Sequence, residues 1–193
     1  MIIHGNRRFL YFWRKIRYAD RCGRQLGRLT EPEIYHTAER VGKLIAGRGD
    51  VLFTGGSTGV MEAAMRGAKQ AGGLTVGLIP AESKSAYAHL GAYIDIHIMT
   101  GLGELGKMAP LIHSVDGVIA IAGGAGTLIE MAMAYISKKP VILVPAVGHT
   151  TAAITHMLAD GYLDYRRIQP IHTAADADSA VQLLYSQLNR SQK

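Results

Sequence analysis

Twice in this chain of 193 residues, a short apolar run passes through a glycine-rich turn into a segment with helical periodicity. The first turn occupies residues 54–62 and reads TGGSTGVME, and the second occupies residues 122–130 and reads AGGAGTLIE. A strand that leads through a glycine turn into a helix is the repeating unit of parallel α/β sheets. The two turns therefore predict an α/β fold.

The remaining segments follow the same order. Apolar runs predict strands over residues 51–53, 74–79, 93–98, 117–121, 141–144 and 168–171, with a less defined first strand at 15–18. Helical periodicity is present over residues 33–46, 60–71, 102–113, 127–137, 150–160 and 177–188, and Pro110 predicts a kink or an irregular start in the third of these. We expect a Rossmann-like, mostly parallel central sheet of about six to seven strands with helices on both faces.

The start of the chain differs from the rest in charge. Arginine and lysine occupy eight of the first 28 positions, and Asp20 is the only acid among them. We expect residues 1–29 to form a basic N-terminal segment that contains the first strand, and residues 30–193 to form a single Rossmann-like ligand-binding domain. The basic segment is compatible with an anion-binding arm, a nucleic-acid contact, a transit peptide, a solvated tail or a subunit contact.

Composition excludes several classes of protein. The single cysteine, Cys22, leaves no disulfide framework or cysteine-based zinc site within one chain, which favours a reducing, cytoplasmic location. No apolar run approaches the roughly 18 residues that a membrane-spanning helix needs. The eight histidines are scattered without metal-ligand spacing, so we predict no metal site.

Neither glycine turn has the lysine of a Walker loop or the GxGxxG spacing of the dinucleotide fingerprint. Both have the chemistry of an anion site, because glycine lets the backbone approach a ligand and the following helix presents N–H groups with a partial positive charge. We predict a bound phosphate, held by Gly55, Gly56, Ser57, Thr58, Gly59, Gly123, Gly124, Ala125, Gly126 and Thr127. The alternative is that these glycines only permit tight packing.

Glu130 follows Thr127 by three residues and falls in the first turn of the helix predicted over residues 127–137. One interpretation is a carboxylate that interacts favourably with the helix N-terminus. The other is an acid directed at the ligand. Glu62 has the same two interpretations, with a weaker case for the ligand.

The second turn resembles the PGGxGTxxE motif of the LOG family, the cytokinin-activating phosphoribohydrolases long described as lysine decarboxylase-like, with Ala122 in place of the proline. The first turn, over residues 55–61, resembles the upstream glycine loop of that family. A closer similarity, from about Thr30 to the end of the chain, is to the DprA/Smf-related Rossmann proteins that include the molybdenum cofactor carriers. It includes residues 55–71, 100–104, 114–130, 139–141 and 161–164.

This resemblance implies a binding or carrier protein for a monophosphorylated heterocycle, either molybdenum cofactor or a nucleoside monophosphate. It implies no further required cofactor and a homo-oligomer, either a dimer or a tetramer. Retention of a ligand without turnover needs no catalytic arginine, which agrees with the absence of an arginine between Arg66 and Arg166.

The resemblance also implies two alternatives. One is hydrolysis of the N-glycosidic bond of a nucleoside 5′-monophosphate, in which Glu130 would act at the ribosyl centre or orient water and Lys107 would replace the arginine that the LOG family uses. Lysine does not reproduce planar, bidentate arginine contacts, which weakens this alternative. The other is DprA-like nucleic-acid binding, with Phe9, Tyr11, Phe12 and Trp13 stacking on bases beside the basic residues. We expect no membrane contact.

Overall fold

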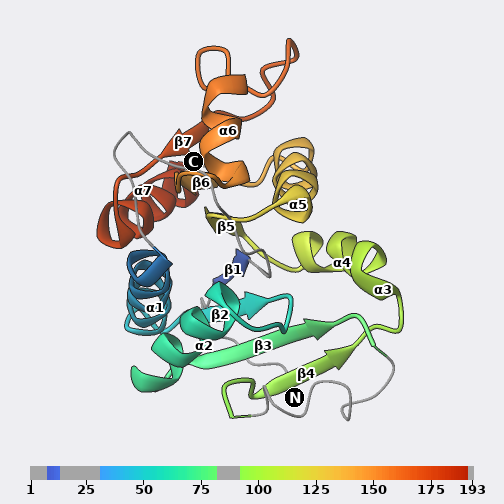
Figure 1. Ribbon diagram of the computed structural model, residues 1–193, viewed down its shortest axis with the longest axis vertical. Coiled ribbons are helices and arrows are strands. Elements are labelled where there is room, and N and C mark those ends of the chain that lie inside the picture. The colour runs from blue at the N-terminus through green and yellow to red at the C-terminus, as the bar shows by residue number, and fades with distance from the viewer. Residues whose placement is uncertain (1–7, 14–30, 82–91, 191–193) are drawn as a thin grey trace.

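The computed structural model describes residues 8–13, 31–81 and 92–190 (Figure 1). Strands and helices alternate along these residues in the following order: β1 (Phe9–Trp13), α1 (Glu31–Ala46), β2 (Val51–Thr54), α2 (Val60–Gln70), β3 (Leu74–Ile79), β4 (Ile96–Met99), α3 (Gly103–Gly106), α4 (Met108–His113), β5 (Gly117–Ile121), α5 (Ala125–Ile136), β6 (Val141–Val144), α6 (Thr150–Met157), β7 (Ile171–Thr173) and α7 (Ala177–Arg190).

The strands form one seven-stranded sheet in the order β4-β3-β2-β1-β5-β6-β7. Every neighbouring pair is parallel. The chain builds outward from β1 through β2, β3 and β4, and then crosses to the other side of β1 for β5, β6 and β7. The predicted Rossmann-like fold with a mostly parallel sheet is confirmed.

The first strand lies earlier than we predicted. The structure places it at Phe9–Trp13, whereas the expected position, residues 15–18, lies outside the described residues. A central parallel strand is covered on both faces and reads as a continuous apolar run. FLYFW is such a run, and Leu10 within it is fully buried. The backbone that we considered as a base-stacking segment therefore pairs with β2 and β5 at the middle of the sheet.

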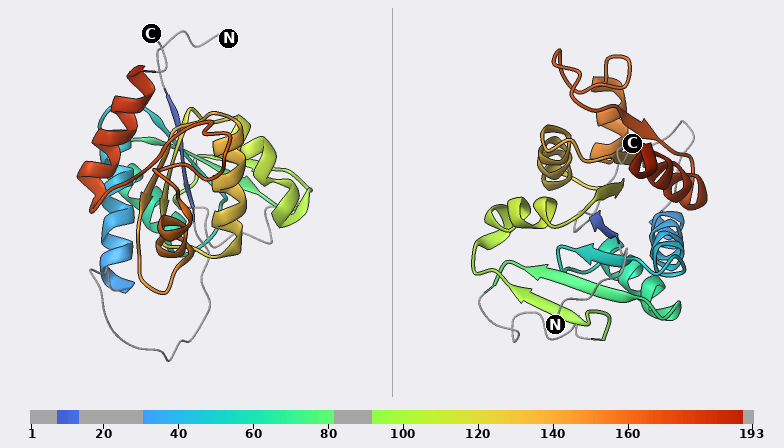
Figure 2. Two further views of the ribbon diagram at one scale, coloured as in Figure 1. Left: turned by 90° about the horizontal axis from the view of Figure 1, so that it is seen from above. Right: turned by 180° about the vertical axis from the view of Figure 1, so that it is seen from behind.

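Two apolar layers separate the sheet from its helices. On one face α1, α2 and α7 pack against the sheet, and on the other face α4, α5 and α6 do so. Alternate residues of β5 supply the two layers: Ile119 and Ile121 face the first, whereas Val118 and Ala120 face the second. Figure 2 shows α1 and α7 on the opposite side of the sheet from α4 and α5. The prediction of helices on both faces is confirmed.

Helices α1 and α2 pack with their backbones almost in contact. A Cβ added at Gly42 would lie 1.9 Å from the carbonyl oxygen of Ala64, and one at Gly67 would lie 1.9 Å from that of Glu39. The Arg66 guanidinium also binds the Glu39 carboxylate across the two helices, at 2.9 Å. Glycine is therefore required at both positions for reasons of packing and not of turn conformation.

The helix predicted over residues 102–113 is broken at Lys107 into α3 and α4. Pro110 is the third residue of α4, where a missing N–H group costs no helical hydrogen bond. The irregular start that Pro110 predicted is confirmed. Other boundaries move by a few residues: α5 begins two residues early at Ala125, and α6 ends at Met157 instead of residue 160.

Candidate functional site at the carboxyl edge of the sheet

The two glycine turns lie at the same edge of the sheet, one strand apart. The first follows β2 and the second follows β5, and both of these strands pair with β1 between them (Figure 1). The chain reverses its direction of growth at β1 and β5. In open α/β sheets, ligands bind outside the carboxyl ends of the strands at this switch point. The topology thus brings both predicted phosphate turns to the expected place.

The first turn leaves the N-terminus of α2 without a side-chain cap. Gly56 and Gly59 have positive φ angles of 64° and 77°. The Gly56 N–H donates to Oγ1 of Thr54 at 3.1 Å. Among the described residues, the N–H groups of Ser57 and Thr58 find no acceptor. These N–H groups and the two half-buried hydroxyl side chains are donors suited to an anion.

The second turn is folded around a buried hydroxyl. Thr127 is 1% exposed, and its Oγ1 has no hydrogen-bond partner within the described part of the chain. Gly123 has a φ of 98°, and a Cβ there would lie 1.9 Å from this Oγ1. Gly124, by contrast, is exposed, and a Cβ there would meet nothing within 4 Å. The turn therefore combines open space with an unused polar atom at the start of α5.

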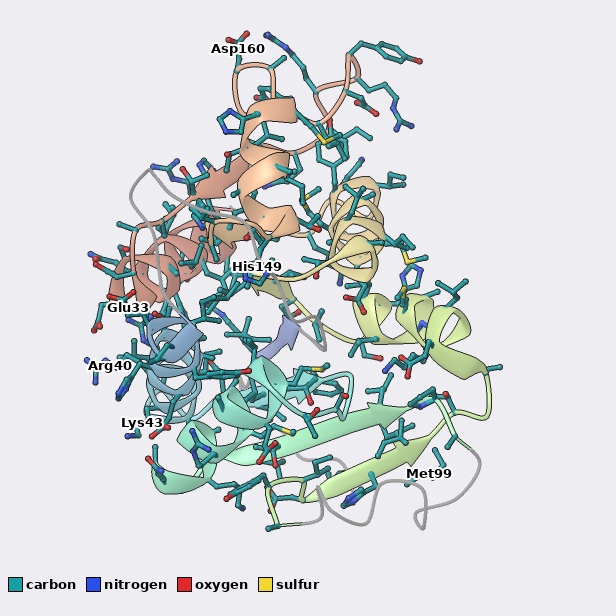
Figure 3. All side chains as sticks on the ribbon, in the orientation of Figure 1. Glu33, Arg40, Lys43, Met99, His149 and Asp160 are labelled. Carbon is teal, nitrogen blue, oxygen red and sulfur yellow. The ribbon has the colours of Figure 1, made fainter. Side chains whose placement is uncertain are left out.

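A third helix begins beside this turn. The N–H of Thr150, the first residue of α6, donates to the carbonyl oxygen of Gly123 at 2.9 Å. His149 occupies the N-cap position of α6 and is half-buried (Figure 3). We had treated His149 as one of several scattered histidines. Only the tertiary structure places Thr150, the residue after His149, against the second turn.

Lys107 lies at the junction of α3 and α4 and contacts the first turn. Its side chain is 1% exposed, and its Nζ donates to the carbonyl oxygen of Gly55 at 2.8 Å. The same Nζ lies 3.1 Å from Oε2 of Glu104, whose side chain is 52% exposed. The ammonium is therefore placed at the Gly55 turn. The enzymatic alternative, in which Lys107 replaces the arginine of the LOG family, has the ammonium hold the ligand itself.

Glu130 lies deeper in its helix than the sequence suggested. Because α5 begins at Ala125, Glu130 belongs to the second helical turn, and it is 1% exposed. It shares the inward face of α5 with Thr127 and Met131, which are also buried. A carboxylate interacts with a helix N-terminus mainly within the first turn. The prediction that Glu130 lies in the first helical turn is therefore wrong, which leaves the helix-dipole interpretation with less support.

The replacement of the motif's proline by Ala122 has a conformational counterpart. Ala122 has a φ of 57°, in the left-handed region, and it is fully buried. The proline ring holds φ near −65°, so proline is incompatible with this backbone. The second turn therefore follows a path that the motif's proline could not take.

No group of three or more histidine, cysteine, aspartate or glutamate side chains that could hold a metal ion occurs in residues 8–13, 31–81 and 92–190. Within the same residues, no helix combines the length and the apolar character needed to span a bilayer. Cys22 and most of the basic segment, residues 1–7 and 14–29, lie outside the described part.

The family model described as the SLOG cluster4 family matches residues 23–176. The chain belongs to the SLOG cluster4 family. Among solved structures, this SLOG cluster4 protein is similar to the molybdenum cofactor binding protein from the phototrophic bacterium Rippkaea orientalis. The two are 30% identical with a TM-score of 0.73, over 95% of this chain and 98% of the other.

It is also similar to the molybdenum cofactor carrier protein from Chlamydomonas reinhardtii, with 30% identity and a TM-score of 0.69 over 96% of this chain and 99% of the other. A third relative is the cytokinin riboside 5′-monophosphate phosphoribohydrolase of Mycobacterium tuberculosis, which is 29% identical over 69% of this chain and 76% of its own. The two resemblances stated from the sequence, to the carriers and to the LOG family, are both confirmed.

Proposed function

We propose that this SLOG cluster4 protein binds or carries a monophosphorylated heterocycle, with the phosphate seated on the second glycine turn. The observation that carries the proposal is the buried Oγ1 of Thr127, which lacks a partner within the described residues beside the open face of Gly124. A buried hydroxyl without a hydrogen bond costs free energy unless something satisfies it. A phosphate oxygen at the start of α5 would accept this hydrogen bond together with those of the backbone N–H groups.

The first turn is suited to a second part of the same ligand or to the same phosphate. It lies across β1 from the second turn and offers the N–H and hydroxyl groups of Ser57 and Thr58. Two helix N-termini at one edge favour an anion more than either does alone. Two of the similar solved structures are named as a molybdenum cofactor binding protein and a molybdenum cofactor carrier protein. These names support a pterin phosphate as the ligand.

A phosphoribohydrolase activity is the second candidate, and the position of Glu130 favours it. This carboxylate is buried on the inward face of α5, one turn beyond the glycine turn. It keeps its place in the GGxGTxxE pattern, and a curated relative is named as a phosphoribohydrolase. In this candidate, Glu130 would stabilise the positive charge that develops at the ribosyl carbon or orient the attacking water. No observation on the described residues favours the nucleic-acid alternative.

The assembly is proposed to be a cytoplasmic homo-oligomer. The methionines at 61 and 131 are buried in the core of the chain itself, so they do not form a contact surface. The candidates for the contact between subunits are exposed apolar side chains of the α3 region and α5: Leu102, Leu105, Ile129 and Ile136. Native mass spectrometry of freshly purified protein measures the subunit number and any retained ligand together.

The function is tested by titration calorimetry with AMP, adenosine and inorganic phosphate. We expect AMP to bind more tightly than adenosine, and Thr127→Val to remove most of that difference while the fold is retained. Thr155→Val is the matched control, because the Thr155 hydroxyl bonds within α6, to the carbonyl of Ala152. Release of adenine from AMP, absent in Glu130→Gln, would establish the second candidate instead. Equal affinity for AMP and adenosine, with no pterin phosphate retained, would overturn the proposal.

A further inference from the structure

Lys107 is an unexpected side chain at this edge, because a lysine is almost never fully buried unless its ammonium has partners. We infer that Lys107 is a positioning residue of the first glycine turn and acts on the ligand only through the carbonyl of Gly55. This inference rests on the proposed function, since it assigns a residue to the first glycine turn, which we propose to hold part of the same ligand. It differs from the enzymatic alternative, in which the ammonium would hold the ligand itself.

The contact between Lys107 and Gly55 is close and leaves little room for a side chain at position 55. The hydrogen bond from Nζ to the Gly55 carbonyl measures 2.8 Å. A Cβ at Gly55 would lie 3.0 Å from this Nζ and 3.2 Å from the sulfur of Met61. Both distances are shorter than an ordinary van der Waals contact. Glycine at position 55 therefore leaves room for the ammonium beneath the turn.

Fixing this carbonyl fixes the start of the turn. A peptide group is planar, so the orientation of the Gly55 carbonyl also sets that of the Gly56 N–H. That N–H donates to Oγ1 of Thr54, so the peptide is held on both sides. The unusual φ of Gly56, 64°, then directs the chain into Ser57 and Thr58, whose N–H groups are offered to the anion. The ammonium thus prepares these donors before any ligand arrives.

The lysine is itself anchored to the neighbouring strand. Gly103, at the start of α3, donates its N–H to the carbonyl of Pro80 at 3.1 Å, directly after β3. Thr100 donates both its N–H and its hydroxyl to the carbonyl of Ile79. The Lys107 N–H donates to the carbonyl of Gly103. Lys107 therefore links the end of β2 to the end of β3, which a flexible surface lysine could not do.

The experiment compares hydrogen exchange and ligand affinity in the full chain. Lys107→Met removes the ammonium and keeps a long apolar side chain of similar reach. Lys139→Met is the matched control, because Nζ of Lys139 also donates to a backbone carbonyl, that of Val115, at 2.6 Å, and it does so near the amino ends of β5 and β6. Amide exchange is measured without ligand over residues 54–62 and 122–130, and the affinity for AMP is measured separately.

We expect Lys107→Met to raise exchange over residues 54–62 by roughly tenfold in the ligand-free protein, and to weaken AMP binding by a similar factor. Exchange over residues 122–130 should stay unchanged, and Lys139→Met should change neither quantity. Gly55→Ala should weaken AMP binding as well, and the double variant should lose no more than the stronger single variant, because both changes break one contact.

Unchanged exchange over residues 54–62 in Lys107→Met, together with weaker AMP binding, would overturn the inference and make Lys107 a direct ligand group. Additive losses in the double variant would do the same. If Lys107→Met does not fold, the Gly55→Ala variant carries the exchange test alone, and unchanged exchange there overturns the inference. The exchange measurement needs no ligand. A wild-type protein that binds no AMP would therefore refute the proposed function, while the exchange over residues 54–62 would still test the contact between Lys107 and Gly55.

Discussion

A Cβ placed on Gly123 would lie 1.9 Å from Oγ1 of Thr127, so the backbone of the second turn is folded directly onto that hydroxyl. Gly124, the next residue, faces open space. The two adjacent glycines of one motif therefore have different roles: Gly123 makes room for an internal contact, and Gly124 leaves open space at the surface.

This difference predicts opposite results for two alanine variants. Gly123→Ala should destabilise the fold by about 3 kcal/mol, because a methyl group collides with Thr127 and the φ of 98° strains any side chain. Gly124→Ala should keep the melting temperature and weaken phosphate binding, because its methyl group occupies the space above the turn. Thermal unfolding and AMP titration of both variants measure these effects. Tight AMP binding by Gly124→Ala would place the ligand elsewhere.

Ala122 provides a second conformational test. Ala122→Pro, which restores the LOG motif, should destabilise the protein by about 3 kcal/mol, since proline cannot adopt a φ of 57°. Ala122→Gly should change stability by less than about 1 kcal/mol, because relief of the left-handed strain offsets the greater freedom of the unfolded chain. Chemical unfolding of both variants decides the point. A stable proline variant would mean that the turn takes another path.

The contact between α1 and α2 should be intolerant of side chains. Gly42→Ala should lower the free energy of unfolding by about 3 kcal/mol, because its Cβ would lie 1.9 Å from the Ala64 carbonyl oxygen, within rigid helix backbone. Gly49→Ala is the control, because a Cβ at Gly49 would meet nothing within 4 Å. Alanine at its φ of 80° costs about 1 kcal/mol of backbone strain. Urea unfolding compares the two. Equal losses would show that steric packing at Gly42 is not the cause.

Asp95 gives a pH dependence of stability. Partial burial opposes its ionisation, but the Lys69 ammonium and the hydrogen bonds from the N–H and hydroxyl of Thr75 together hold the pKa of this carboxyl below its usual value. A carboxyl with a lowered folded pKa stabilises the protein above its unfolded pKa near 4, and that contribution is lost as the pH falls through the folded pKa. Asp95→Asn should reduce stability by about 1 kcal/mol at pH 7 and much less at pH 3. An equal loss at both pH values would contradict this.

Many of the core strands and both glycine turns could be predicted from the local sequence. The runs at Gly117–Ile121 and Val141–Val144 are continuously apolar, and Leu74–Ile79 is apolar except for the buried Thr75; all three were predicted with the boundaries that the structure shows. Nearly every residue of these strands is buried, which favours apolar side chains on both faces. The glycine turns were equally visible, because a positive φ at Gly56, Gly59 and Gly123 demands a residue without a side chain.

The first strand and the helix boundaries could not be predicted as well from the sequence. The aromatic and apolar residues of Phe9–Trp13 suited a surface stacking role as well as a central strand, and only the pairing with β2 and β5 decides between them. The start of α5 at Ala125 depends on the backbone of Gly124, and this shift of two residues moved Glu130 out of the first helical turn.

The sequence by itself determined the fold class, the two turns and the family resemblance, because strand burial, glycine conformation and helix starts are local properties of the chain. The tertiary structure alone decided which groups meet at the carboxyl edge. Lys107 and Gly55 are 52 residues apart, and their hydrogen bond exists because α3 is tied to the end of β3. The unused hydroxyl of Thr127 is likewise a consequence of burial, which depends on how the sheet and helices pack around it.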